Sequence, residues 1–409
     1  MKCCVEEVKT MKVLQITAFS GWGCTGRISV GISNALCKEG YDNYIAWGRI
    51  NTASENVKTI QIGNLLDQMI HGLYTRLTDK CGFGSKKCTE EFVKKLESLN
   101  PDLIQLHILH GYYINLEVLF AAIKRLEIPV VWTFHDCWAF TGHCPYFDLV
   151  GCQKWKTGCH NCEQKSHHPT SWGLDNSKNN WEKKKELFTG IKNLTIVTPS
   201  FWLKSLVEQS FFKDAKICVI NNGIDLSIFK PTKSDFRKKY KLENKKILLG
   251  VSSTWVESKG IEDFKFLAKN LPRDYQIVMV GLNKKQIKEL PKEIICIERT
   301  DSVKKLAEIY STADVFVNPT YEDNFPTTNI ESLACGTPVI TYNTGGSVEA
   351  AGNEFGCVVP QGDMSALLKC ILSENWKCNR SDCVAYAQNF DANKKYDEYV
   401  ALYGGIING

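Results

Sequence analysis

Two carboxylates lie close to an expected helix start in the segment 318–331, which reads NPTYEDNFPTTNIE. Asp323 precedes that helix, and Glu331 falls about a turn and a half into it. Both side chains are therefore expected to face one cleft, where each carboxylate can accept hydrogen bonds from its own set of ligand hydroxyls. For Asp323 alone, a surface acid on an ordinary capped helix is the simpler interpretation, but that does not account for the whole string.

The same helix start is expected to bind anions through its backbone. Pro326 suits the first turn of a helix, because its missing N–H and fixed φ cost nothing there. The amides of Phe325, Thr327 and Thr328 would then line the helix N-terminus, a ready site for a diphosphate or for sugar oxygens. The helix is expected to stop at Gly336, a residue typical of helix C-termini.

A second candidate phosphate site follows the first strand, where Gly21, Gly23 and Gly26 form the pattern G-x-G-x-x-G. Glycines there permit a tight turn and close approach of the backbone to a phosphate. A dinucleotide enzyme normally has an acid at the end of the second strand, whereas this sequence has Arg49, which fits the 2′-phosphate of NADP. An NADP-dependent Rossmann oxidoreductase is therefore one alternative, and a glycine turn needed only for packing is another.

Four cysteines gather in a loop at 143–163 that is rich in Gly, Trp and His. They are Cys144, Cys152, Cys159 and Cys162. Four thiolates could close a structural zinc site and order this long loop, with His143 or His160 as substitutes, although only the last pair has C-x-x-C spacing. The alternative is a reduced loop with buried cysteines.

Strand and helix patterns alternate along the chain, which predicts parallel α/β sheets. The strands expected in a first unit are 13–19, 44–47, 103–106, 130–134 and 194–197. After a turn near Gly223 and a lysine-rich segment the pattern restarts, with strands expected at 247–251, 276–280, 294–297, 315–318 and 338–341. Two successive doubly wound units that face each other are the simplest architecture.

Bulk composition limits the remaining classes of protein. The chain has 409 residues, enough for two domains, and a formal net charge of +5 that does not demand nucleic acid. It has no apolar run of about 18 residues and no secretory signal at its N-terminus, so we expect a cytoplasmic protein. Lys183, Lys184 and Lys185 could attract an anionic membrane surface weakly, with a solvated helix face as the simpler interpretation.

These motifs together resemble the retaining glycosyltransferases of family 4, in particular those of bacterial capsular and exopolysaccharide biosynthesis. The resemblance covers residues 11–400. The matching pieces are the glycine loop, Thr133–Asp136, Asn222–Asp225, Lys259–Gly260, the segment from Asp323 to Glu331 and the turn Gly336–Pro338. The resemblance implies the α/β GT-B fold, with two facing Rossmann-like domains and a C-terminal helix that crosses back.

The resemblance also implies roles for three catalytic residues. Lys259 would neutralise the diphosphate leaving group, an electrostatic effect that grows as charge develops. Asp323 would hold hydroxyls of the donor sugar, and His135 would contact that sugar at the reacting face. No cofactor would be required, since the donor is a UDP- or GDP-linked sugar.

The implied donor-binding residues lie mainly in the second half of the chain. Glu331 would hold the ribose hydroxyls, and Gly23 would approach the diphosphate from the first domain. Arg299 and Thr300 would lie near the base. The remaining donor-binding residues are Phe325, Pro326, Thr327 and Thr328.

Three features of the sequence qualify the resemblance. Asp323 stands where the family usually has Glu, and Ser253 and Thr254 stand where many members have an Arg. The diphosphate would therefore depend more than usual on Lys259 and on helix amides. The sequence contains no Asp-x-Asp, the motif that binds the diphosphate through a divalent ion in the alternative architecture, which favours metal-independent transfer.

We expect an N-terminal extension at 1–10, an acceptor-binding domain at 11–215, a nucleotide-sugar-binding domain at 216–384 and a terminal helix at 385–409. The resemblance implies a saccharide acceptor linked to a polyprenyl diphosphate, used in surface polysaccharide biosynthesis. Such an enzyme is expected to make peripheral contact with the inner face of the cell membrane. A non-catalytic sugar-binding protein of the same fold is the remaining alternative.

Overall fold

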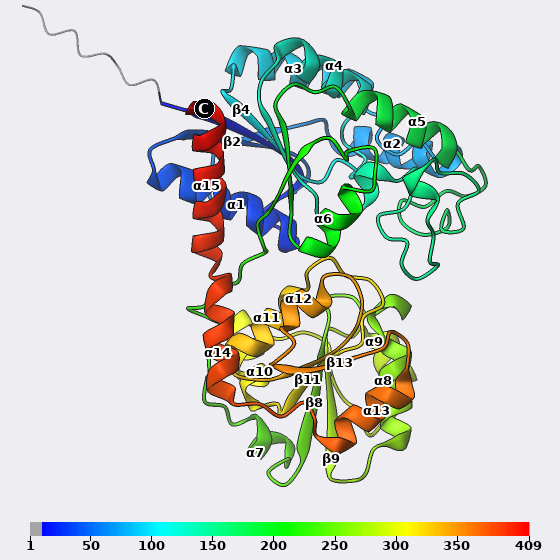
Figure 1. Cartoon of the computed structure of the whole chain (residues 1–409), viewed down its shortest axis with the longest axis vertical. Coiled ribbons are helices and arrows are strands. Elements are labelled where there is room, and N and C mark those ends of the chain that lie inside the picture. The colour runs from blue at the N-terminus through cyan, green and yellow to red at the C-terminus, as the bar shows by residue number, and fades with distance from the viewer. Residues whose placement is uncertain (1–9, 409) are drawn as a thin grey trace, which may run out of the picture. The chain divides into compact units, whose positions relative to one another are not determined.

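The computed structural model describes residues 10–408, so nearly all of the expected extension at 1–10 lies outside the described residues. The chain forms two compact units. Unit 1 contains the chain up to Pro199, Leu203–Ile220 and the residues from Tyr396 onward, and unit 2 contains Ser200–Trp202 and Asn221–Lys395. Each unit is a parallel sheet covered by helices (Figure 1).

The sheet of unit 1 has seven strands in the order β3-β2-β1-β4-β5-β6-β7. Its strands are β1 Lys12–Ser20, β2 Asp42–Asn51, β3 Thr59–Gln61, β4 Leu103–Leu106, β5 Val130–Thr133, β6 Leu194–Thr198 and β7 Lys216–Val219. Its helices are α1 Gly23–Lys38, α2 Leu65–Thr78, α3 Lys86–Leu99, α4 Leu116–Leu126 and α5 Ser177–Phe188, with the short η1 Trp138–Phe140 and η2 Lys154–Lys156. The central strands are buried along their whole length, as expected for a parallel sheet covered on both faces.

The sheet of unit 2 has six strands in the order β10-β9-β8-β11-β12-β13. They are β8 Lys246–Val251, β9 Tyr275–Val280, β10 Ile295–Ile297, β11 Val315–Asn318, β12 Val339–Tyr342 and β13 Gly356–Val359. The helices are α7 Phe236–Tyr240, η3 Glu257–Lys259, α8 Ile261–Asn270, α9 Lys284–Glu289, α10 Val303–Thr312, α11 Thr327–Ala334, α12 Ser347–Ala351, α13 Met364–Ser373, α14 Arg380–Ala387 and η4 Gln388–Phe390. Two remaining helices, α6 Phe201–Val207 and α15 Ala392–Asn408, begin in unit 2 and continue in unit 1.

The α/β fold with two Rossmann-like sheets is confirmed, and all ten expected strands form. Three further strands form, β3, β7 and β13, and of these the sequence suggested only β7, as a strand at Val219 that runs into the turn near Gly223. Each lies at the edge of its sheet and is only partly buried, so none carries the continuous apolar run that marks a central strand. One of them, β7, begins at Lys216, where we expected the second domain to begin, yet it pairs with β6 in the sheet of unit 1.

The chain end contains two helices where the sequence suggested one. After α14 the backbone passes through η4 and restarts as α15. In unit 1, Tyr399 and Tyr403 of α15 share a buried cluster with Ile28 and Ile32 of α1. A Cβ on Gly31 of α1 would lie 2.1 Å from the Tyr396 ring, so glycine is required at this close contact.

The cluster Lys183–Lys185 on α5 is not the basic surface that the sequence suggested. Lys184 is buried, and its Nζ lies 3.3 Å from the centre of the Trp138 ring. The same Nζ donates to the carbonyls of Trp138 and Thr141 at 2.8 and 3.1 Å. Burial lowers the pKa of Lys184 to about 7, whereas its neighbours Lys183 and Lys185 are exposed.

Candidate active site

The polar network at the end of β11 is built on a close approach of two backbone segments. Lys259 ends η3, and Gly260 follows with φ +76°, in the left-handed region that favours glycine. A Cβ on Gly260 would lie 2.4 Å from the carbonyl oxygen of Pro319, so a larger residue would push the two segments apart. Glycine at this position therefore lets the turn carry Lys259 against the loop that follows β11.

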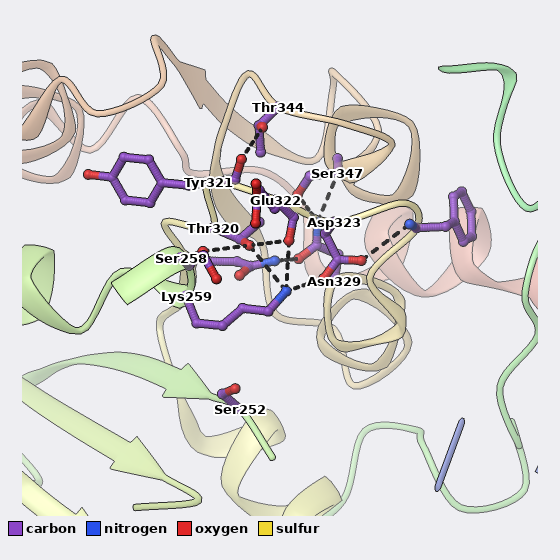
Figure 2. A network of polar contacts seen from close by, with 12 residues as sticks. Ser252, Ser258, Lys259, Thr320, Tyr321, Glu322, Asp323, Asn329, Thr344 and Ser347 are labelled. Atoms are coloured by element: carbon purple, nitrogen blue, oxygen red, sulfur yellow. Dashed lines mark hydrogen bonds and ion pairs between the residues drawn. The ribbon is translucent and has the colours of Figure 1, made fainter. Parts of the chain in front are cut away.

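The ammonium group of Lys259 lies at the centre of this network (Figure 2). Its Nζ lies 2.7 Å from Asp323 Oδ2, and it donates to the Glu322 carbonyl at 2.9 Å and to Thr320 Oγ1 at 3.3 Å. Both charged side chains of the pair are about a quarter exposed, so a ligand can reach them. The arrangement holds one positive charge in place beside a carboxylate at the carboxyl end of a parallel strand.

The carboxylate of Asp323 is held from two sides. Oδ2 is paired with Lys259, and Oδ1 accepts the backbone N–H of Phe325 at 3.3 Å. An ionised carboxylate offers about four lone pairs, so both oxygens retain capacity to accept from ligand hydroxyls. The Phe325 amide is thus occupied by Asp323 in this structure, while its role toward a donor stays a prediction.

Two consecutive glycines border the same loop. A Cβ on Gly345 would lie 1.9 Å from the Asp323 carbonyl, and one on Gly346 would lie 1.8 Å from the Asn324 carbonyl. The N–H of Gly346 donates to the Asp323 carbonyl at 3.0 Å, and Thr344 Oγ1 donates to that of Tyr321 at 2.9 Å. The Thr-Gly-Gly turn after β12 therefore fixes the backbone of the loop that carries Asp323.

The start of α11 fits the expected anion site. Its cap residue is Pro326, and within residues 10–408 no side chain caps this helix end. Thr327 and Thr328 occupy its first turn, where backbone N–H groups have no partner within the helix. No acidic residue lies in that turn, and the charge of Asp323, which precedes it, is balanced by Lys259.

Asn329 joins three elements, and sequence reasoning did not single it out. Its Oδ1 accepts from Asn318 Nδ2 at 2.8 Å, and its Nδ2 donates to the carbonyl and hydroxyl of Ser347 at 3.0 and 3.1 Å. These bonds tie the end of β11, α11 and the start of α12 together (Figure 2). The only signal available in the sequence was an asparagine three residues after Pro326, inside an expected helix.

Glu331 lies on α11, where it is 9% exposed. The hydroxyl of Tyr310 on α10 donates to its Oε2 at 3.2 Å. Tyr310 itself is fully buried, so it orients the carboxylate from within the core. Arg299 and Thr300 lie on the segment between β10 and α10, with Arg299 exposed, and neither is among the hydrogen-bond partners that Lys259 has within the described residues.

His135 and Gly23 belong to unit 1. His135 follows β5, and its Nε2 lies 3.1 Å from Nδ1 of His107, whose Nε2 lies 3.1 Å from Gln15 Oε1. The Gln15 amide is oriented by its Nε2, which donates to the Ser29 carbonyl at 2.9 Å. Because Gln15 Oε1 can only accept, His107 carries its proton on Nε2, and its Nδ1 accepts from Nε2–H of His135.

The hydrogen bonds from Gln15 through His107 to His135, together with burial, fix the protonation state of His135. Burial lowers the pKa of His135 to about 4 and holds that of His107 well below its usual value. Both rings are therefore neutral at pH 7, and Nδ1 of His135 is a hydrogen-bond acceptor. The neighbouring Asp136 binds His110 Nε2 at 2.7 Å, and these residues line one small cavity of unit 1.

The three glycines after β1 have different tasks. A Cβ on Gly21 would lie 2.8 Å from backbone atoms of Thr52 and Ala53, and Gly26 packs against Gly21 at 3.0 Å. Gly23 starts α1 with φ +69°, and no atom lies within 4 Å of its would-be Cβ. Packing therefore explains the first and third glycines, whereas Gly23 faces open space at a helix start.

Of the two alternatives for the cysteine loop, the structure supports a reduced loop with partly buried cysteines and not a zinc site. Cys144, Cys152, Cys159 and Cys162 line one cavity, yet within residues 10–408 no three or more metal-binding side chains are placed to hold an ion. The Sγ of Cys159 instead accepts the N–H of Gly142 at 3.2 Å, and Cys144 is hydrogen bonded to Cys162. Aromatic packing around Trp155 and a buried Asp79–His143 pair order the loop.

Family models match both halves of the chain. Residues 30–228 match the Glycosyltransferase Family 4 model, and residues 232–389 match Glycosyl transferases group 1. Both models describe glycosyltransferases and together they cover most of the chain, so the chain is a glycosyltransferase with a Family 4 N-terminal half and a group 1 C-terminal half. The NADP-dependent oxidoreductase and the non-catalytic protein are not favoured by these matches.

Two curated relatives show the kinds of enzyme that the chain is similar to. It is 21% identical over 379 residues to the putative colanic acid biosynthesis glycosyl transferase WcaC of Escherichia coli, covering 88% of this chain and 90% of the relative. It is 27% identical over 212 residues to N,N'-diacetylbacillosaminyl-diphospho-undecaprenol alpha-1,3-N-acetylgalactosaminyltransferase of Campylobacter jejuni, covering 48% of this chain and 56% of that protein.

Solved structures establish the GT-B fold. A sucrose-phosphate synthase from Thermosynechococcus elongatus matches with a TM-score of 0.70 at 18% identity, over 97% of this chain and 99% of that one. Anabaena HepE in complex with UDP matches with a TM-score of 0.67 at 15% identity, over 97% and 100%. At these identities the likeness concerns the fold alone.

Proposed function

We propose that this enzyme transfers a sugar, with retention of anomeric configuration, from a UDP- or GDP-linked donor to a saccharide acceptor. The observation that carries the proposal is the pairing of Lys259 with Asp323 beside the uncapped start of α11. A fixed ammonium group and free helix amides suit a diphosphate, and a carboxylate with spare lone pairs suits sugar hydroxyls. HepE, whose fold this chain shares, was solved with UDP.

In this proposal the donor spans unit 2 from its base to its sugar. Glu331, oriented by Tyr310, holds the two ribose hydroxyls, and Arg299 and Thr300 lie near the base. The amides of Thr327 and Thr328 bind the diphosphate, with Lys259 as the cation that balances its charge. Asp323 accepts hydrogen bonds from the sugar.

The residues of unit 1 complete the proposed chemistry. Gly23 approaches the diphosphate at the start of α1, and the acceptor nitrogen of His135 takes a hydrogen bond from a donor-sugar hydroxyl. The anomeric carbon loses its bond to the phosphate oxygen and gains a bond to the acceptor oxygen on the same face. The acceptor proton passes to the departing phosphate oxygen, whose growing charge Lys259 stabilises.

The acceptor is proposed from the relatives. WcaC is named for colanic acid biosynthesis, and the Campylobacter enzyme acts on a saccharide linked to diphospho-undecaprenol. We infer a lipid-linked saccharide acceptor in surface polysaccharide biosynthesis, reached by peripheral contact with the membrane. Within the described residues no helix is long and apolar enough to cross a bilayer.

Calorimetric titration of the protein with UDP, GDP and their sugars, in the presence of EDTA, tests the donor site. One nucleotide series should bind, and Lys259→Met should weaken it about tenfold, since a hydrogen bond to a charged group contributes roughly 1.5–3 kcal/mol. Lys265→Met is the matched control, because Lys265 on α8 is 30% exposed, much like Lys259, and pairs with a different carboxylate, that of Glu262. Absence of binding to either series would contradict the proposal.

A further inference from the structure

Helix α2 (Leu65–Thr78) is oriented against the usual pattern of an amphipathic helix. The residues that it buries are Gln68, His71, Gly72 and Thr75. At about 100° per residue these four occupy one side of the helix. A surface helix normally turns its apolar side to the core, so a buried side made of polar and small residues needs an explanation.

Hydrogen bonds hold α2 in this orientation. His71 Nδ1 lies 2.9 Å from Ser85 Oγ, and its Nε2 accepts the backbone N–H groups of Gly82 and Gly84 at 3.2 Å. Gln68 Nε2 donates to the carbonyl of Gly48 on β2. Burial lowers the pKa of His71 to about 4, so the ring stays a neutral acceptor at pH 7. The helix cannot turn its apolar side inward without breaking these bonds.

The opposite side of α2 is apolar and exposed. Its six large residues are each between 50% and 69% exposed, and they are Leu65, Leu66, Met69, Ile70, Leu73 and Leu77. They fall within an arc of about 140° along a length of about 18 Å. Single exposed apolar residues are ordinary, but a continuous exposed face of this size marks an interaction surface.

The apolar face continues beyond the end of the helix. The N–H of Trp172 donates to the Arg76 carbonyl of α2 at 2.8 Å, and the Arg76 guanidinium lies 5.9 Å from the centre of the Trp172 ring. Trp172 and Leu174 are 64% and 60% exposed. We call α2 together with Trp172 and Leu174 the α2 face.

Basic groups border the α2 face. Arg76 lies beside Trp172, Lys80 follows the helix end, and Lys165 donates to the Gly173 carbonyl at 3.0 Å. The acids nearest in sequence are engaged by backbone groups, since Asp67 accepts the N–H of Asn64 and Asp175 accepts those of Cys162 and Ser177. The border therefore favours a negatively charged partner.

We propose that the α2 face docks on an anionic phospholipid membrane, with α2 lying in the plane of the interface. A convex helix surface carrying Leu, Ile, Met and a bordering Trp, with cations at its edge, has the chemistry of an interfacial helix. This inference deepens the proposed function and rests on it, because a lipid-linked acceptor is presented at a membrane surface. It replaces Lys183–Lys185 as the expected contact.

Co-sedimentation of the full chain with vesicles of phosphatidylcholine and phosphatidylglycerol tests the proposal. The wild type should bind, and Ile70→Glu/Leu73→Glu should lower the partition coefficient at least tenfold, because it places two charges at the centre of the face. The matched control is Val303→Glu/Leu372→Glu, which charges two exposed apolar residues of unit 2 and should bind like the wild type. High salt should weaken binding without abolishing it.

Equal vesicle binding of the wild type and the α2 variant would overturn the proposal, as would a wild type that stays in solution. A third outcome would also overturn it: the wild type is a dimer in sedimentation velocity, the α2 variant is a monomer, and neither binds vesicles. The α2 face would then be the contact with a second copy of the chain. Nucleotide titration of the same preparations separates the two claims. Vesicle binding without nucleotide binding would contradict the proposed function alone, and the reverse result would contradict the α2 face alone.

Discussion

At the scale of single residues, Glu331 offers the cleanest test of the donor site, because its carboxylate is oriented by a partner that is far from solvent. We expect Glu331→Gln to lower nucleotide affinity about tenfold, since a neutral amide replaces charge-assisted hydrogen bonds to the ribose. The melting temperature should change little, because Gln Oε1 can still accept from the Tyr310 hydroxyl. Titration calorimetry together with a thermal melt measures both.

Tyr310→Phe is the matched control for Glu331→Gln. It removes the hydrogen bond to the carboxylate but leaves the charge, so nucleotide affinity should fall less than in the glutamine variant. Equal affinities of the wild type and Glu331→Gln would show that this carboxylate does not contact the nucleotide.

His107 is a positioning residue in the second residue-scale prediction. His107→Leu removes the acceptor for Nε2–H of His135, so kcat should fall roughly tenfold while nucleotide affinity in unit 2 stays the same. His107→Gln can accept from His135 and donate to Gln15, so it should restore much of the rate. A fall in nucleotide affinity that matches the fall in kcat would contradict a role exerted through His135.

The sequence identified Lys259 and Asp323 separately, by motif, but it could not show that they are paired. The pair depends on a turn and a loop 64 positions apart that meet at the end of β11. Asn329 was missed for the same reason, since its partners on β11 and α12 become neighbours only in the folded sheet. Local spacing finds residue types, and tertiary structure decides which of them touch.

At the scale of elements, two glycines of the turn before α1 have different expected roles, one in packing and one in phosphate binding. Gly21→Ala should destabilise unit 1 by about 1–3 kcal/mol, because φ is +74° and the new methyl would meet the backbone of Thr52 and Ala53. Gly23→Ala should cost less, about 1 kcal/mol, because its space is open and only the φ of +69° is strained.

Urea unfolding of both glycine variants measures this difference, and donor turnover measures the proposed phosphate contact. We expect Gly23→Ala to lose turnover despite its smaller loss of stability, because a methyl group there would stand between the backbone and the diphosphate. Full turnover in Gly23→Ala would contradict the proposed phosphate contact and leave packing as the only role of these glycines.

Apolar patterns in the sequence predict most helices and strands, but for α2 they do not predict which side of the helix is buried. The spacing of Leu65, Met69, Ile70 and Leu73 is that of a helix with an apolar side, which sequence alone would place in the core. The structure buries the opposite side, because His71 and Gln68 have specific backbone partners in unit 1. Periodicity locates an apolar side but does not say what covers it.

At the scale of the whole molecule, buried histidines make stability depend on pH. Burial lowers the pKa of His71 and His135 to about 4, against 6.5 in an unfolded chain. Between these values the unfolded chain binds protons that the native state does not, so stability is complete above about pH 6.5 and falls toward pH 4. The loss should be roughly 1–3 kcal/mol for each histidine.

Urea unfolding at pH 7.5 and at pH 5 measures this loss. His143 has the opposite shift: burial lowers its pKa, but the hydrogen bond to Asp79 and the negative charge of Asp79 together raise it above the usual value. His71→Gln should reduce the loss between the two pH values, since it removes one group whose pKa is depressed in the native state. Equal stability of the wild type at both pH values would show that these rings are not held neutral.

The architecture of the whole chain could be predicted well, because the central strands carry apolar runs that are recognisable in the sequence. Edge strands such as β7 are short and partly polar, so the division between the units could not be placed from sequence. A zinc site in the cysteine loop was considered from the residue types alone, and the aromatic packing around Trp155 could not be predicted from the sequence.

The central claim is retaining, metal-independent transfer from a nucleotide sugar at the Lys259–Asp323 site. The most direct measurement incubates the enzyme with UDP- and GDP-sugars, a bacterial lipid extract and EDTA, and follows the sugar into the lipid fraction by NMR. The account predicts that one donor is consumed, that the new linkage keeps the anomeric configuration of the donor, and that Lys259→Met abolishes it. Inversion at the anomeric carbon, or transfer that needs added Mg²⁺ or Mn²⁺, would contradict the account.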